Sequence, residues 1–166
     1  MARRQARELA FRTLFQAERG GLPVKDVWQE VREAFRTEAL EVEEALGPQL
    51  VGEDIAFAER LIDTYAQHQD ELDKRLDATL EGWTFSQMAQ TDLNVLRLAL
   101  TELTYEDLPK EVTIEVAIRI AKKYGGEESG RFVNGVLARL VRNNVSSSSG
   151  SDKGSDEKVS SDEVPG

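Results

Sequence analysis

Arginines and phenylalanines are interleaved at helical spacing in the first 19 residues. Five arginines stand there against two glutamates, a local charge of +3 in a chain whose net charge is −10. At about 100° per residue, Phe11 and Phe15 fall on one side of a helix, opposite an apolar stripe, and Arg4 and Arg7 fall beside them. Guanidinium groups among rings can hold phosphates while bases stack, as single-stranded RNA binding requires. The alternative is that the rings pack beneath a second helical layer and the arginines only solvate its edge.

Outside this segment the sequence offers no recognisable catalytic arrangement. The single histidine, His68, lies in a polar stretch with no carboxylate–serine pattern around it. The chain has no cysteine, which excludes disulfides and thiolate metal sites and favours a reducing compartment. No metal-ligand spacing, nucleophile elbow or phosphate loop is present. We therefore expect a protein that is not an enzyme and that needs no cofactor or metal.

Length and composition fit a soluble helical protein. A chain of 166 residues allows one domain, or two small helical lobes that share a core. No apolar run approaches the roughly 18–20 residues of a membrane span, and the N-terminus lacks a signal-peptide core, so we expect a cytoplasmic protein with no membrane contact. The net acidity opposes long-range attraction to nucleic acid but permits a local basic patch.

Helical periodicity recurs along the chain without a convincing alternating strand pattern, so we expect an all-α fold. Turn residues at Gly47-Pro48, Gly82, Leu108-Pro109 and Gly125-Gly126 separate the helices. The periodic segments predict seven helices, over residues 1–19, 23–44, 53–67, 71–80, 86–106, 110–124 and 127–143. We expect one helical domain over 1–145 and a disordered tail over 146–166, because that tail is rich in serine, glycine and aspartate with almost nothing to bury.

The predicted fifth helix, residues 86–106, is the most apolar segment of the chain. Its leucine seam is widened by further apolar residues, which indicates a helix almost surrounded by protein. One polar stripe remains, formed by Gln90, Asn94, Arg97, Thr101 and Thr104. Arg97 either faces RNA from this stripe or is a buried ion-pair partner, of Glu102 or of an acid on another helix.

Four sequence blocks, in matching order and spacing, resemble those of a known family. They are ARRQARELA at 2–10, LRLALTEL at 96–103, AKKYG at 121–125 and SGRFVNGVL at 129–137. Together they resemble the NusB family of bacterial transcription factors, over roughly 2–142. The resemblance implies two helical lobes, no catalysis and no cofactor. It also implies pairing with NusE, a small-subunit ribosomal protein, on the boxA element of nascent RNA.

In that family the pair helps load an antitermination complex on RNA polymerase, chiefly at ribosomal RNA operons. Some members self-associate through the RNA-facing surface, so a homodimer is an open alternative here. The resemblance assigns RNA contact to Arg3, Arg4, Arg7, Phe15, Arg97, Glu128, Arg131, Phe132 and Asn134. Phe11 joins this set as a further stacking ring on the first helix. Asp92 matches an acidic position associated with the NusE contact.

Structural alternatives stand beside several of these assignments. Phe132 either stacks on RNA or belongs to the core. Asn134 and Gly135 either contact RNA or allow two helices to approach closely. At the level of function, the alternatives are a non-catalytic helical scaffold for protein interactions and an accessory domain like that fused to certain ribosomal RNA methyltransferases. Methyl transfer in cis is not expected, because the sequence contains no cofactor-binding βα unit.

Overall fold

The computed structural model describes the backbone of residues 3–46 and 48–163, and the side chains of residues 3–37 and 52–143. Across this described part every regular element is a helix and no strand occurs. The elements are α1 (Arg4–Gly20), α2 (Val24–Leu46), α3 (Pro48–Gln67), α4 (Gln69–Thr79), the 3-10 helix η1 (Phe85–Gln87), α5 (Gln90–Tyr105) and α6 (Lys110–Glu163). The all-α fold expected from the periodicity is confirmed.

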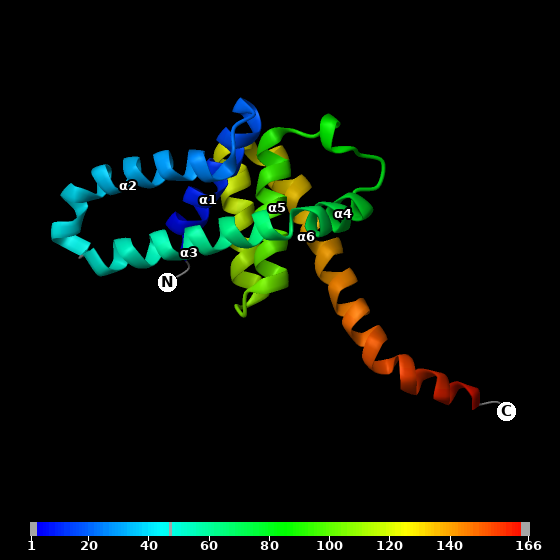
Figure 1. Cartoon of the computed structure of the whole chain (residues 1–166). Helices are drawn as coiled ribbons and strands as arrows, with labels where there is room; N and C mark the ends of the chain where they lie inside the picture. The colour runs from blue at the N-terminus through cyan, green and yellow to red at the C-terminus, as the bar shows by residue number, and fades with distance from the viewer. Residues whose placement is uncertain (1–2, 47, 164–166) are drawn as a thin grey trace.

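The helices pack as two groups around α5. In one group α1, α2 and α3 pack against one another, and in the other α4, α5 and α6 do so. Helix α5 also packs against α1 and α3, which joins the two lobes (Figure 1). Residues 92–102 of α5 are buried without interruption, as its apolar composition predicts. Figure 1 shows α2 and α3 side by side as a long hairpin that reaches away from α5.

Helix α6 is interrupted at Gly125-Gly126, where the sequence predicts a helix end. Gly126 has φ 89° and ψ −177°, a conformation that no helix contains and that favours glycine. Gly125 is needed for a different reason, because an added Cβ would lie 2.2 Å from Oγ of Ser129. Divided at Gly126, α6 gives two helical segments, and the described part of the chain then holds the seven expected.

Some predicted boundaries differ from the observed ones. Helix α5 begins at Gln90 and not at residue 86, because Met88 and Ala89 are extended and only the short η1 precedes them. Helix α3 begins at Pro48, five residues earlier than expected. The backbone of α6 continues to Glu163, while the side chains of residues 144–166 lie outside the described part. Disorder over 146–166 therefore stays a prediction, as does the domain boundary at 145.

Candidate nucleic-acid interface

The stacking role predicted for Phe11 is wrong, because its ring is only 2% exposed. The ring centroid of Phe11 lies 5.0 Å from that of Tyr124 and 5.6 Å from that of Phe15. Tyr124 belongs to α6, which covers α1 from a distant part of the sequence. The alternative that the rings pack beneath a second helical layer is therefore correct for Phe11. The buried ring of Phe11 therefore packs beneath the rings of Phe15 and Tyr124.

Those two rings, Phe15 and Tyr124, keep solvent-accessible surface. Phe15 is partly buried, and Tyr124 is 41% exposed. The guanidinium of Arg19 lies 5.6 Å from the Phe15 ring centroid, so a cation sits directly beside an accessible ring. Tyr124 was not among the site residues predicted from the sequence. The sequence did contain a signal for Tyr124, since this residue belongs to the AKKYG block and lies directly before the Gly125-Gly126 break.

Glu8 ties this ring cluster to α6. Its carboxylate accepts a hydrogen bond from Lys123 Nζ at 2.5 Å and one from the Tyr124 hydroxyl at 2.6 Å. Burial raises the pKa of Glu8, but the bonds from Lys123 and Tyr124 outweigh it, and the net pKa lies below the ordinary value. Burial and the bond to Glu8 raise the pKa of Tyr124 to about 12, so its hydroxyl remains a donor at neutral pH.

Arg7 is buried and not available to a phosphate, contrary to the prediction. Its Nε donates to Oε1 of Glu102 at 2.8 Å, and its Nη2 pairs with Oε2 of the same carboxylate. Thr113 Oγ1 also donates to Glu102 Oε2, at 2.6 Å. An unpaired charge is costly inside a protein, so loss of either Arg7 or Glu102 would leave the other buried without its counter-charge. Both side chains line an interior cavity of about 20 Å³ between α1, α3, α5 and α6.

The other two arginines of the predicted motif differ in exposure. Arg3 has φ 53° and its guanidinium lies 5.1 Å from the centroid of the buried Phe57 ring. Arg7 and Arg60 lie over the same ring, at 5.4 Å and 5.0 Å. The Arg3 guanidinium therefore packs against the Phe57 ring, whereas the Arg4 side chain is exposed. Of the three predicted arginines, Arg4 is the most exposed, and its charge also helps to lower the pKa of Glu8.

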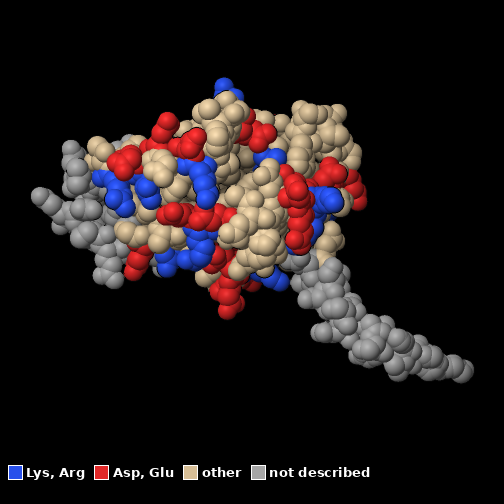
Figure 2. Space-filling model, in the orientation of Figure 1, with Lys and Arg blue, Asp and Glu red and all other residues tan. Residues whose placement is uncertain are grey.

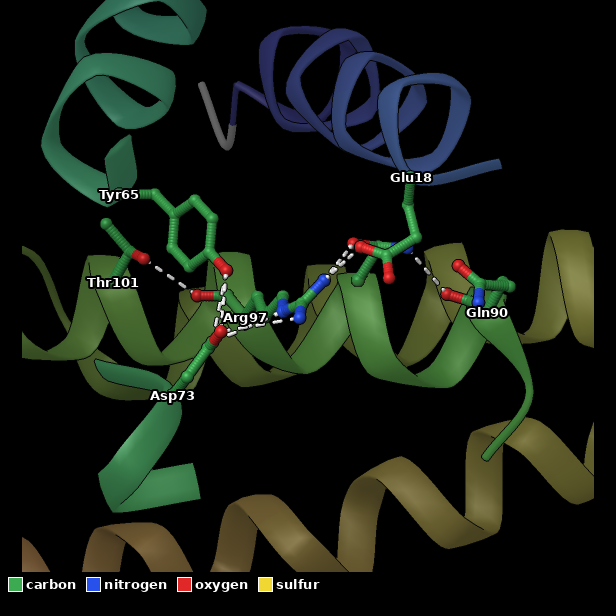
Figure 3. Close-up of polar contacts among 7 residues, drawn as sticks. Glu18, Tyr65, Asp73, Gln90, Arg97 and Thr101 are labelled. Carbon is green, nitrogen blue, oxygen red and sulfur yellow. Dashed lines mark hydrogen bonds and ion pairs between the residues drawn. The ribbon is translucent and has the colours of Figure 1, made fainter. Parts of the chain in front are cut away.

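Arg97 is also held inside the protein, and the ion-pair alternative is correct for it. Its side chain donates to Glu18 of α1 at 2.6 Å and to both oxygens of Asp73 of α4 at 3.2 and 3.3 Å (Figure 3). The Tyr65 hydroxyl of α3 donates to the same Asp73 at 3.0 Å. Arg97 is only 8% exposed, so its predicted contact with RNA is not available in this conformation. The partners are acids on other helices, and Glu102 instead pairs with Arg7.

This network joins four helices at one guanidinium. Burial lowers the pKa of Arg97, but nearby Tyr65 and the acids Glu18 and Asp73 raise it, and the net pKa lies above its ordinary value. The charge of Arg97 is therefore fixed, and its role is to hold α1, α3 and α4 against α5. It positions the helix that carries Arg4, Phe15 and Arg19.

The predicted residues of the second α6 segment lie near the surface. Glu128, Arg131 and Asn134 are exposed, and Phe132 is partly buried against the core. Asn134 and Gly135 are both exposed, and a Cβ added at Gly135 would meet nothing within 4 Å, so the alternative of a close helix approach at this pair is wrong. The Phe132 ring meets Trp83 edge-on, with centroids 5.5 Å apart and planes at 66°. This segment follows Tyr124 in the sequence, after the Gly126 break.

Asp92, assigned to the partner contact, lies in the first turn of α5 and is buried. Burial raises its pKa, and a hydrogen bond from the Ser129 side chain opposes that rise. Its Oδ1 has no hydrogen-bond partner among the described residues. Its contact with the partner stays a prediction, and the low exposure of Asp92 leaves little side-chain area for such a contact.

On the face shown in Figure 2, charges of both signs are interspersed and form no wide patch of a single sign. We use the name ring–arginine strip for the two exposed arginines of α1 and the two accessible rings that pack on Phe11: Arg4, Arg19, Phe15 and Tyr124. No group of three or more metal-ligating side chains occurs among the described residues. Within the same described part, no helix combines the length and apolar character needed to cross a bilayer.

Comparison with known proteins identifies the family. The family model for NusB matches residues 4–142. The chain belongs to the NusB family. The transcription antitermination protein NusB of Thermus thermophilus is 51% identical over 140 residues, which cover 84% of this chain and 90% of that protein. Like those relatives, the chain is a transcription antitermination protein without catalytic activity.

Solved NusB structures have the same fold. The structure of NusB from T. maritima superimposes with a TM-score of 0.69 at 34% identity, covering 84% of this chain and 90% of that one. A structure of the antitermination factors NusB and NusE in complex with double-stranded RNA gives a TM-score of 0.67 at 24% identity, covering 86% and 97%. At that identity the second likeness establishes the fold alone.

Proposed function

We propose that the chain binds boxA-type RNA together with NusE, through the ring–arginine strip and the adjoining second segment of α6. Bound in this way, it helps assemble antitermination complexes on RNA polymerase, chiefly on ribosomal RNA transcripts in the cytoplasm. Support for the partners comes from the NusB relatives, one of which was crystallised with NusE and RNA. The carrying observation is that Tyr124 and Phe15 stay accessible above the buried Phe11, with Arg19 beside them.

Each group in the strip has a role that its geometry permits. Exposed Arg4 and Arg19 neutralise phosphates, while the accessible faces of Phe15 and Tyr124 stack on bases. Arg7 and Arg97 fix the position of α1 from inside and do not touch RNA. The net charge of −10 opposes each phosphate, so NusE contributes much of the affinity.

The test is filter binding of labelled boxA RNA to the full chain, with and without NusE, at several salt concentrations. Arg4→Glu and Arg19→Glu should weaken binding, and each should reduce the salt slope by about 0.7 for every phosphate of a single strand that is no longer neutralised. Arg36→Glu is the matched control, because Arg36 is exposed on α2, a helix that carries no residue of the strip, and its reversal changes the net charge equally. A duplex of the same sequence shows whether single-stranded RNA is the preferred form.

Two outcomes would favour other interpretations. If the control weakens binding as much as Arg4→Glu, the charge of the whole molecule and not the strip governs affinity. If the chain binds NusE but no RNA in any combination, the helical protein-interaction scaffold is the better description. A homodimer is tested in the same preparation by sedimentation, and RNA that dissociates it would indicate that the two copies meet through the strip.

A further inference from the structure

Trp83 is an exposed aromatic residue outside the ring–arginine strip. It lies in the connection between α4 and η1 and is 46% exposed, although its ring meets the partly buried Phe132 edge-on at 5.5 Å. Edge-on packing covers one ring edge and leaves much of the indole face open. A residue that served only to cover Phe132 would be buried further by that contact.

The backbone on both sides of Trp83 is ordered by local hydrogen bonds. The Trp83 amide donates to the Leu80 carbonyl at 3.5 Å across a turn in which Gly82 has φ 80°. A positive φ at the third position is what a type II turn requires. Directly after Trp83, Thr84 and Gln87 form a capping box at the start of η1. The indole is thus presented by a defined loop, which lowers the entropy lost when it binds.

Two cationic side chains, Arg131 and Arg139, accompany this ring pair and can meet an anionic ligand, although the acids Glu81 and Glu128 partly offset them. Arg131 precedes Phe132, is exposed and has no ion pair with any described residue. Arg139 lies two helical turns further along and pairs with Glu81 only at 3.8 Å. Phe132 belongs to the second segment of α6, which follows Tyr124 after the Gly126 break. Glu81 and Thr84, which lie close to Trp83 in the sequence, are polar. With these neighbours Trp83 does not form the continuous apolar area that a protein partner would bury.

We propose that Trp83 stacks on a nucleobase of the bound RNA and extends the RNA path from the ring–arginine strip over the second segment of α6 to the α4–η1 connection. This inference rests on the proposed function. It adds a contact on a different lobe from α1, since Trp83 follows α4. An RNA bound in this way would touch both lobes of the protein.

Tryptophan fluorescence tests this directly, because the chain has only two tryptophans. Trp28 is 4% exposed in the core, so iodide should quench Trp83 selectively. On titration with single-stranded boxA RNA in the presence of NusE, emission from Trp83 should fall and its iodide quenching should disappear. The Trp83→Phe variant supplies the background from Trp28. Anisotropy of the labelled RNA records binding independently in the same samples.

The RNA affinities of Trp83 variants provide a second test of the inference. Trp83→Ala should weaken RNA binding about five- to 150-fold, the range for loss of one base–aromatic stack, while Trp83→Phe should keep most of the affinity. Leu22→Ala, at an exposed apolar residue on the α1–α2 turn, should change nothing. RNA that binds with unchanged Trp83 emission overturns the inference and leaves the proposed function intact. Quenching by NusE alone, with no further change on adding RNA, overturns it in favour of a protein contact.

Discussion

Arg7 of α1 and Glu102 of α5 form a buried two-point ion pair across the interface between the two lobes. The pair explains why an arginine within the basic N-terminal motif does not face solvent. Thr113 of α6 donates to the same carboxylate, so three helices meet at Glu102. The N-terminal motif therefore combines arginines of two kinds: Arg7 fastens the helix, and Arg4 remains at the surface.

Removal of one partner from this pair should destabilise the fold strongly. We expect Glu102→Ala to lower the free energy of unfolding by about 3–5 kcal/mol, because Arg7 would remain buried without its counter-charge. Arg7→Met combined with Glu102→Met should recover most of that loss, since no buried charge then remains. Urea denaturation of the single and double variants measures the coupling. Additive losses in the double variant would show that the two side chains do not depend on each other.

Glu8 should restrain RNA binding, because it places a negative charge within the ring–arginine strip. Glu8→Gln keeps the size and can still accept a bond from Tyr124. We expect RNA affinity to rise about two- to fivefold, because a partly buried carboxylate that opposes phosphate is neutralised and Lys123 loses its counter-charge, a change worth roughly 0.4–1 kcal/mol. Filter binding at two salt concentrations measures this, and the gain should shrink at the higher one. Weaker binding by Glu8→Gln would mean that Glu8 instead orients Tyr124 for RNA.

The same carboxylate predicts a pH dependence of stability. The pKa of Glu8 is lowered in the folded chain from 4.5, so its contribution is present above that pH and is lost as pH falls through the folded value. Acid unfolding of the Glu8→Gln variant should therefore lose part of its pH dependence below about 4.5. Urea midpoints measured between neutral and acid pH provide the comparison. Identical pH profiles for the two proteins would contradict the lowered pKa.

Tyr124 should contribute to RNA binding through its ring. Tyr124→Ala removes an accessible stacking face and should weaken binding about five- to 150-fold, whereas Tyr124→Phe should stay close to the parent. Thermal melting of both variants controls for damage to the Phe11 contact beneath the ring. Equal losses in the two variants would assign the effect to the hydroxyl and its bond to Glu8.

Gly125 should tolerate no side chain. A Cβ there would lie 2.2 Å from Ser129 Oγ and 3.3 Å from Thr91 Cγ2, so Gly125→Ala should cost about 1–3 kcal/mol of stability through overpacking. Gly52→Ala is the matched control, because nothing lies within 4 Å of its Cβ in α3. That control should stabilise the helix by up to about 1 kcal/mol. Equal effects of both substitutions, measured by denaturation, would contradict the close approach.

Local periodicity was sufficient to predict the helices and the core face of α1. Its apolar stripe is buried as expected, at Ala6, Leu9, Ala10, Thr13, Leu14 and Ala17. Periodicity shows which residues share a face but not what covers the opposite face. Phe11 is covered by Tyr124, more than a hundred residues later, and Arg7 by Glu102. The expectation that these two side chains face solvent failed for that reason.

Arg97 also shows that periodicity does not reveal what covers a helix face. Its place on the single polar stripe of α5 was predicted correctly, but a polar stripe can face solvent or face charges of other helices. The acids that meet it, Glu18 and Asp73, lie 79 and 24 residues away in sequence. The resemblance to a family supplied the function. The structure then separates the arginines assigned to RNA by that resemblance into those at the surface and those that position helices from inside.

The proposed function requires RNA to run along Arg4, Phe15, Arg19 and Tyr124. The most direct measurement is photo-crosslinking of boxA RNA containing 4-thiouridine to the full chain with NusE, followed by mass spectrometry of the cross-linked peptides. Cross-links are expected at Phe15 and Tyr124. Cross-links confined to α2 and α3, with α1 and the 121–134 segment unmodified, would contradict it.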